Sequence, residues 1–161
     1  MIDAYIGLGS NLDKPLAQVS SAFIQLDEIK QTSLFDISSL YLSRPLGPKN
    51  QPPYVNAVAW IKTKLDAHEL LEQLHTIENT HGRKRDGERW GARTLDLDIL
   101  VYGNICIKDQ VLTIPHPGIK SREFVLYPLH EVNKNLMIPK VGLISRIKSR
   151  CYVNGMARLN F

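Results

Sequence analysis

Two aspartates, Asp96 and Asp98, stand two residues apart in the segment 94–100, which reads TLDLDIL. Apolar and polar residues alternate along it, and this pattern predicts a β-strand with one apolar face and one acidic face. Two residues of strand advance roughly 6.6 Å, so both carboxylates emerge on the same face. Neighbouring carboxylates repel each other unless a cation lies between them, and Mg²⁺ usually takes one or two such ligands and leaves its other positions to water and phosphate.

A basic segment comes directly before this strand. Its five cationic side chains fall within eleven residues and face only two acids, Asp86 and Glu88; the cations are Arg83, Lys84, Arg85, Arg89 and Arg93. A charge run of this kind is usually a solvated loop, but a polar loop has no need of Trp90 between its arginines. Carboxylates that hold a metal, next to arginines that bind phosphate oxygens in pairs, indicate phosphoryl transfer.

The composition describes an ordinary globular protein. The chain has 161 residues, and the length predicts a single domain over 1–161. A net charge of +4 favours an anionic partner. Cys106 and Cys151 form no metal-ligand spacing and no disulfide framework. The sequence shows neither a secretory signal nor a segment long enough to cross a membrane, so we expect a cytoplasmic protein with no membrane partner.

The elements that must position the acidic strand follow from periodicity and turn residues. We expect a strand over 4–8, a helix with Pro15 in its first turn, and strands over 36–42 and 54–63. A second helix begins at a capping box formed by Asp66 and Glu69 and ends at Gly82. With the acidic strand, the order is β-α-β-β-α-β.

This order predicts an α+β fold of the ferredoxin-like kind, in which two helices cover one face of an antiparallel sheet. An added strand at 112–114 and a short helix at 122–129 extend the core, and the basic tail from Lys140 onward is expected to be a solvated flank. The second sheet face would then be open for a site, and four polar or aromatic residues have the parity to lie on it: Tyr54, Asn56, Asp96 and Asp98.

Two other segments contain candidate functional residues. The stretch from Gly7 to Asn11 contains two glycines, but it lacks the third glycine of a dinucleotide fingerprint and the lysine of a Walker loop, so a tight turn is expected there. The segment 43–53 holds four prolines and one glycine, which indicates a long loop of the kind that often acts as a lid.

The segment RKRDGERWGARTLDLDIL, from Arg83 to Leu100, resembles the signature of the 6-hydroxymethyl-7,8-dihydropterin pyrophosphokinase family of folate biosynthesis. Weaker matches extend the resemblance over residues 1 to about 140. The resemblance implies that the pterin hydroxymethyl oxygen attacks the β-phosphorus of ATP, which releases AMP. It also implies that two Mg²⁺ ions, held by Asp96 and Asp98, serve as cofactor, with ATP as co-substrate.

The resemblance assigns further roles. Arg83 and Arg93 would join Asp96 and Asp98 as catalytic residues. The pterin would be bound by Ser43, Pro45, Leu46, Tyr54, Asn56 and Phe124. ATP would be bound by Glu78, Arg85, Trp90, Ile99, Thr113, His116 and Arg122. The sequence departs from the family pattern at His75, Ala92 and Gly118, where the family more often has glutamine, proline and a basic residue.

Two alternatives come from other classes of protein. An RNA-recognition module has the same order of elements, but its aromatic strand motif is absent and an acidic strand would repel phosphate without metal. An inactive scaffold homologue is disfavoured because every candidate chemical residue is present. We therefore expect an enzyme with ATP and the pterin as its partners, no nucleic acid, and a monomeric state.

Overall fold

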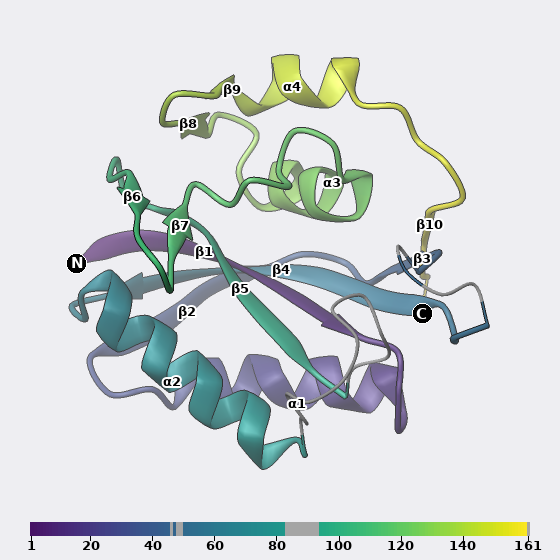
Figure 1. Ribbon diagram of the computed structural model, residues 1–161, viewed down its shortest axis with the longest axis horizontal. Helices are drawn as coiled ribbons and strands as arrows, with labels where there is room; N and C mark the ends of the chain where they lie inside the picture. Colours follow the sequence, from purple (N-terminus) through teal and green to yellow (C-terminus); the bar gives the residue numbers. More distant parts are fainter. Residues whose placement is uncertain (46, 48–49, 83–93, 161) are drawn as a thin grey trace.

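An antiparallel sheet of six strands forms the middle layer of the computed structural model, which describes residues 1–45, 47, 50–82 and 94–160 (Figure 1). The strand order is β10-β3-β4-β1-β5, and β2 also pairs with β4. These strands are β1 (Ile2–Ser10), β2 (Thr32–Ile37), β3 (Tyr41–Ser43), β4 (Tyr54–Thr63), β5 (Asp96–Tyr102) and β10 (Ala157–Arg158). The α+β class expected from the sequence is confirmed.

Helices lie on both faces of this sheet (Figure 1). The first pair, α1 (Pro15–Asp27) and α2 (Ala67–Thr80), covers one face, while α3 (Glu123–Val132) covers part of the other and α4 (Ile144–Arg150) packs on α3. Two short hairpins complete the described part; they comprise β6 (Ile107–Lys108), β7 (Thr113–Ile114), β8 (Met137–Ile138) and β9 (Gly142–Leu143). No helix in the described part is both long enough and apolar enough to span a membrane.

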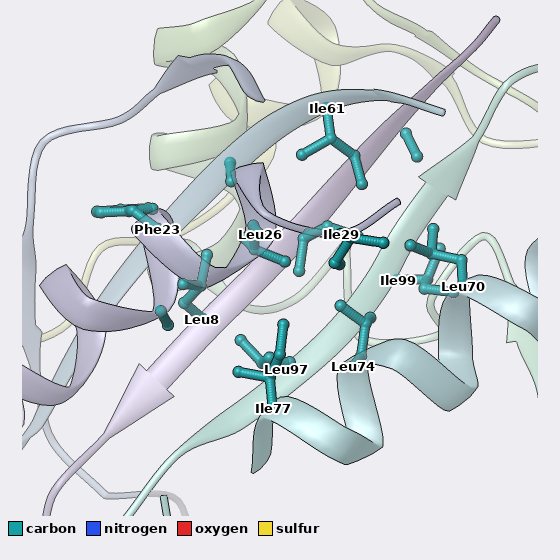
Figure 2. Close-up of a cluster of buried hydrophobic side chains, with 14 of the residues drawn as sticks. Leu8, Phe23, Leu26, Ile29, Ile61, Leu70, Leu74, Ile77, Leu97 and Ile99 are labelled. Carbon is teal, nitrogen blue, oxygen red and sulfur yellow. The ribbon is translucent and has the colours of Figure 1, made fainter. Parts of the chain in front are cut away.

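The main core lies between the sheet and the α1–α2 pair (Figure 2). From β5 it receives Leu97 and Ile99, which are 2% and 3% exposed, and from α2 it receives the buried stripe of Leu70, Leu74 and Ile77. Each such side chain stabilises the fold by roughly 1.5–3 kcal/mol when it leaves water. Because successive strand residues point to opposite faces, burial of Leu97 and Ile99 fixes Asp96 and Asp98 on the other face.

Local signals in the sequence set the ends of α2. Asp66 accepts a hydrogen bond from the Glu69 N–H at 2.9 Å, and the Asp66 N–H donates to Glu69 Oε2 at 2.8 Å, which is the expected capping box. Gly82 follows the helix with a φ of 76°, a value that glycine adopts without strain. The expected helix at Pro15 and the strand over 54–63 are also confirmed.

Three expectations about the fold were wrong. The single strand expected over 36–42 is two strands, because Ser38 between them bonds to the main chain of Val58 instead of continuing the ladder. The turn expected from Gly9 onward is wrong at Gly9 and Ser10, which lie inside β1 together with Gly7. The added strand expected at 112–114, by contrast, is confirmed as β7, which pairs with β6 in a separate hairpin. The C-terminal segment is not only a solvated flank, since Ile144 is fully buried and β10 pairs with β3.

The second sheet face is also less open than expected. Helix α3 covers the part of it that carries Tyr5, Val58 and Leu100, and these side chains form a second core with Leu126 and Leu129 of the helix. The apolar residues at these positions explain why the helix packs there. The polar positions lie nearer the ends of β4 and β5, so the candidate site is confined to the part of this face that the second core does not include.

Candidate active site

One row across the sheet joins the two groups of candidate residues. Gly9 of β1 lies opposite Asn56 of β4 on one side and opposite Asp96 of β5 on the other. Neighbouring strands are about 4.8 Å apart, so the main chains of Asn56 and Asp96 are separated by roughly 10 Å. In the next row, Gly7 lies between Val58 and Asp98. We call the sheet face that carries Asn56, Asp96 and Asp98 the site face.

The middle strand contributes no side chain to the site face at these two rows. A Cβ atom added to Gly9 would lie 3.4 Å from Asn56 Oδ1 and 3.6 Å from the Tyr54 ring, so any larger side chain would enter the space between the strands' polar groups. A Cβ on Gly7 would lie 3.2 Å from Leu100, which is tighter than ordinary contact. The two glycines therefore keep a flat floor of main chain between the amide of Asn56 and the carboxylates.

Asn56 is buried and its amide has a fixed orientation. Its Nδ2 donates to Ser43 Oγ at 2.6 Å, and both residues are buried, with exposed fractions of 5% and 4%. Because the amino group is used in this way, the acceptor Oδ1 is presented toward Gly9 on the floor. The pair thus offers a hydrogen-bond acceptor to a ligand that lies on the site face.

One aromatic side chain lies near this acceptor, and a second comes from the helix that packs on the same face of the sheet. Tyr54 is half-buried and lies two residues before Asn56 on β4, while Phe124, also half-buried, comes from the first turn of α3. Pro45, two residues after Ser43, is half-buried as well. A planar ring between two aromatic faces would gain about 0.5–1.5 kcal/mol per pair beyond its burial.

A hollow opens along β5, which is the last strand of the main sheet as the structure describes it. The described residues that line it come from α2, β5, the β6–β7 hairpin and the turn that follows: Leu71, His75, Glu78, Asp96, Leu97, Asp98, Ile99, Val111, Leu112, Thr113, His116 and Pro117. The side chain of Ile99 is buried in the main core, so Ile99 presents its main chain to this hollow. Five of the seven residues expected to contact ATP belong to the described part, and four of them line the hollow: Glu78, Ile99, Thr113 and His116.

Glu78 connects α2 to the acidic strand. Its side chain is buried, with 1% exposed, and Oε2 accepts the N–H of Leu97 at 2.9 Å. This bond satisfies a main-chain donor on a strand edge, which would otherwise be costly to bury. It also fixes the main chain between Asp96 and Asp98, so Glu78 helps to orient both carboxylates.

His116 is held in one protonation state beside the carboxylates. Its Nδ1 accepts the N–H of Gly118 at 2.9 Å, and its Nε2 lies 3.9 Å from Asp98 Oδ2. Burial lowers the pKa of His116 to about 4; the Arg122 guanidinium acts in the same direction, against a smaller opposing effect of Asp96. At neutral pH the imidazole is therefore neutral, with its hydrogen on Nε2, and Nε2 acts as a donor next to Asp98.

Arg122 lies over Gly118. A Cβ on that glycine would come within 2.6 Å of Arg122 Nε and 2.7 Å of Cζ, which is closer than side chains tolerate. The absence of a side chain at position 118, where the sequence departs from the family pattern, thus makes room for the Arg122 side chain. Arg122 is also the N-cap residue of α3, so the cation stands where the helix begins.

The residues present fit a magnesium ion better than a transition metal. Asp96 and Asp98 are both half-buried on the site face, and the described residues contain no group of three His, Cys, Asp or Glu side chains suited to a metal. Two carboxylates without nitrogen or sulfur ligands are typical of Mg²⁺ sites that share the ion with water and substrate phosphates.

Several predicted site residues lie outside the described part of the chain; they are Leu46, Arg83, Arg85, Trp90 and Arg93. The departure from the family pattern at Ala92 also lies outside it. Among the other predicted site residues, Ser43, Tyr54 and Asn56 lie together on β3 and β4. A second group lines the hollow along β5 and comprises Glu78, Asp96, Asp98, Ile99, Thr113 and His116. Sequence reasoning missed Gly7 and Gly9 as the floor and Leu71 as a lining residue. The two glycines had the same parity as the acidic residues of β5, and this was the available signal.

Comparison with known proteins identifies the family. The model of 7,8-dihydro-6-hydroxymethylpterin-pyrophosphokinase (HPPK) matches residues 5–134. The 2-amino-4-hydroxy-6-hydroxymethyldihydropteridine pyrophosphokinase of Haemophilus influenzae is 48% identical over 160 residues, which are 99% of each chain. The protein of the same name from Pseudomonas aeruginosa is 41% identical over 155 residues, which are 96% of this chain and 95% of that one.

Solved structures agree at the level of the fold. A crystal structure of an HPPK-DHPS in complex with substrates has a TM-score of 0.71 at 13% identity, and the match covers 92% of this chain and 43% of that one. The Plasmodium falciparum HPPK-DHPS A437G structure with STZ-DHP has a TM-score of 0.69 at 13% identity, covering 92% and 45%. The chain thus spans less than half of these structures. By its family model and its full-length relatives, the chain belongs to the HPPK family.

Proposed function

We propose that this protein transfers pyrophosphate from ATP to the hydroxymethyl group of 6-hydroxymethyl-7,8-dihydropterin, giving the pterin diphosphate and AMP. One observation carries the proposal: in the row Asn56–Gly9–Asp96, about 10 Å of sheet separates the main chain of Asn56, whose amide offers an acceptor, from that of Asp96, whose carboxylate borders the hollow along β5. The relatives that share nearly the whole chain are named for this reaction.

The pterin would lie on the glycine floor. Asn56 Oδ1 would accept a hydrogen bond from a ring N–H or amino group, and the faces of Tyr54 and Phe124 would enclose the ring. Ser43 orients the amide, and Pro45 and Leu46 would complete the pocket. Because Ser43 and Asn56 are buried, they favour a ring that carries a matching hydrogen-bond donor. A ring without that donor would leave the buried Asn56 acceptor unpaired.

ATP would occupy the hollow along β5. The main chain of Ile99 would meet the edge of the base, and Thr113 and His116, which line the same hollow, would approach from the hairpin side. His116 Nε2–H is a neutral donor for a phosphate oxygen, and Arg122 brings a positive charge to the same region. Glu78, whose carboxylate is engaged by the Leu97 N–H, acts mainly by orienting the acidic strand. Arg85 and Trp90 are assigned to ATP by family resemblance.

We propose that two Mg²⁺ ions are held by Asp96 and Asp98. When bound, the metal supplies positive charge that neutralises the triphosphate and the attacking oxygen during an in-line displacement. The two aspartates hold this charge at a set position on the site face, and their strand is fixed by the main core behind it. His116 remains neutral beside Asp98 and so adds a donor without competing for the carboxylate by charge.

In the reaction, a bond forms between the hydroxymethyl oxygen and the β-phosphorus while the bond from the β-phosphorus to the α–β bridging oxygen breaks. That oxygen leaves with AMP, and the hydroxyl proton is lost to solvent. Arg83 and Arg93 would stabilise the charge that develops on the transferred group; arginines in this role are worth roughly 10³–10⁵ in rate.

Finer aspects of the architecture also belong to the proposal. The order β5-β1-β4 followed by β2 and β3, with α1 and α2 on one face, fits the ferredoxin-like arrangement. We propose that residues 1–161 act as one domain and as a monomer. Both cysteines are free, which is consistent with a reducing cytoplasm. The RNA-binding alternative receives no support from the family match or from the acidic site face.

Nucleotide analysis tests the reaction directly. Protein incubated with ATP, Mg²⁺ and the hydroxymethyl pterin should release AMP in proportion to pterin consumed, and EDTA should stop the release. The products are separated by ion-exchange chromatography and counted against a sample without pterin. Formation of ADP would show transfer of the γ-phosphoryl group and would overturn the assigned point of attack. A folded protein that consumes no nucleotide would overturn the enzymatic function.

The contact between Gly118 and Arg122 gives a more local prediction. Gly118→Ala forces the Arg122 side chain to move, so we expect the KM for ATP to rise by up to about tenfold, the value of one charged hydrogen bond. The side chain has room to move at its flexible end, so the melting temperature should stay near that of wild type. The neighbouring exposed Lys120→Ala is the matched control. An unchanged KM for ATP in Gly118→Ala would remove Arg122 from the nucleotide site.

A further inference from the structure

One carboxylate ties α3 to three separate parts of the chain. Glu131 Oε1 accepts hydrogen bonds from the Ser39 N–H at 2.9 Å and from Ser39 Oγ at 2.7 Å, and Oε2 accepts one from the Tyr41 hydroxyl at 2.5 Å. Arg158 of β10 approaches Oε1 at 3.8 Å. We call Ser39, Tyr41 and Glu131 the Glu131 cluster. It connects the end of α3 to β3 and to the segment before β3.

The surroundings of Glu131 and Tyr41 determine the protonation states of both side chains. Burial raises the pKa of Glu131, but the hydrogen bonds from Tyr41 and Ser39 together outweigh this effect, so the pKa of Glu131 lies below its usual range. Burial and the bond to Glu131 both raise the pKa of Tyr41. At neutral pH the carboxylate is charged and the phenol keeps its proton. Hydrogen bonds to a charged acceptor are about twice as strong as neutral ones.

The cluster adjoins the proposed pterin pocket along β3. Tyr41 is the cross-strand partner of Asn56, and two residues further along β3, Ser43 is the partner of Tyr54 and accepts the Asn56 amide. On α3, Glu131 follows Phe124 by seven residues, which is nearly two full turns and places both on the same helix face. The cluster therefore joins the strand that orients Asn56 to the helix that carries Phe124.

Other contacts of α3 do not fix this distance as well. Glu123 Oε1 in the first turn accepts the Asn154 N–H at 3.2 Å, and Asn133, the C-cap residue, donates to the Tyr5 hydroxyl at 2.9 Å, but neither bond reaches β3. The buried residues Val125, Leu126 and Leu129 hold the helix to the sheet through apolar contacts. Apolar contacts are non-directional and permit small slides of a helix, whereas hydrogen bonds have a direction.

We propose that Glu131 is a positioning residue for pterin binding: by joining α3 to β3, it sets the gap between Phe124 and the Ser43–Asn56 pair. This inference rests on the proposed function. Glu131 does not itself reach the substrate, and its effect is carried by Phe124 on the helix and by Asn56 through β3. Misplacement of binding groups by as little as 1 Å is enough to cost about a hundredfold in a well-fitted site.

The experiment compares Glu131→Ala and Glu131→Gln with Val132→Ala. Val132 is buried on the same helix, so its truncation destabilises α3 without touching the cluster. We expect Glu131→Ala to raise the KM for the pterin at least about tenfold and the KM for ATP less than about threefold, since most of the nucleotide hollow lies on β5, α2 and the hairpin. Glu131→Gln keeps an acceptor for Ser39 and should recover part of the pterin affinity.

The same measurements separate positioning from stability. Val132→Ala should lower the melting temperature while leaving the KM for the pterin within about twofold of wild type. If Glu131→Ala lowers the melting temperature but leaves both KM values unchanged, or raises both equally, the cluster is only structural and the inference is overturned. Should Glu131→Ala fail to fold, Glu131→Gln alone decides, and a pterin KM equal to wild type overturns the proposal. Failure of wild type to use the pterin would instead overturn the proposed function.

Discussion

Asp96→Asn should reduce kcat at least about a thousandfold, since loss of roughly 4 kcal/mol of transition-state stabilisation corresponds to three powers of ten. The amide has the shape of the carboxylate but cannot hold a divalent cation with the same strength. Asp96 is half-buried on the site face and lies outside both apolar cores, so the fold should persist. Steady-state AMP release over a magnesium titration measures the loss, and the melting temperature reports the fold.

Glu72→Gln provides a matched control for this experiment. Glu72 is an exposed acid on α2, and its exchange removes the same charge without touching the site face. It should leave kcat and the magnesium requirement unchanged. The melting temperature of Asp96→Asn should equal or exceed that of wild type without metal, because one of two neighbouring negative charges is gone. An Asp96→Asn enzyme with near-normal kcat would show that Asp96 does not hold the metal.

Asn56→Leu should weaken pterin binding by roughly a hundredfold, the value of about two buried hydrogen bonds. Leucine has a similar volume but lacks the Oδ1 acceptor above Gly9, and it leaves the buried Ser43 hydroxyl without the amide donor. The KM for ATP should change little, because Asn56 does not line the hollow along β5. Titration of the pterin in the presence of a non-hydrolysable ATP analogue measures the affinity.

Ser43→Ala distinguishes orientation from contact. Removing the hydroxyl leaves the Asn56 amide in place but frees it to rotate, so we expect a smaller loss of pterin affinity, about tenfold. If Asn56→Leu changed ATP and pterin binding equally, the row from Asn56 to Asp96 would not divide the site into two parts. Equal effects of Asn56→Leu and Ser43→Ala would mean that orientation of the amide accounts for the whole contribution.

The sequence predicted those parts of the molecule that depend on neighbouring residues. The alternation around Asp96 and Asp98 correctly placed both carboxylates opposite the apolar core, because the apolar residues between them leave only one way to orient the strand. The capping box of Asp66 marked the start of α2 for a similar reason, since a cap is formed within four residues. A similar alternation over residues 54–63 predicted the limits of β4.

Contacts between distant segments were not predictable in this way. Apolar Val58 and Leu100 had the parity of the site face, yet nothing local showed that α3 would cover them. Gly9 looks like a turn residue when read alone, and only the pairing of Gly7 and Gly9 with β4 and β5 reveals the floor. The Glu131 cluster joins residues some ninety positions apart, with sequence separations of 92 and 90 for its Ser39 and Tyr41 bonds.

The glycine floor has a consequence for inhibitors and for resistance to them. A flat competitor that rested on the main chain at Gly7 and Gly9 would contact atoms that every substitution leaves in place. Resistance at these positions would require an added side chain, and at Gly7 such a chain meets Leu100 at 3.2 Å. At Gly9 it would project toward Asn56 and Tyr54, into the proposed pterin pocket. A mutation there that weakened inhibitor binding would therefore also weaken the enzyme's own activity.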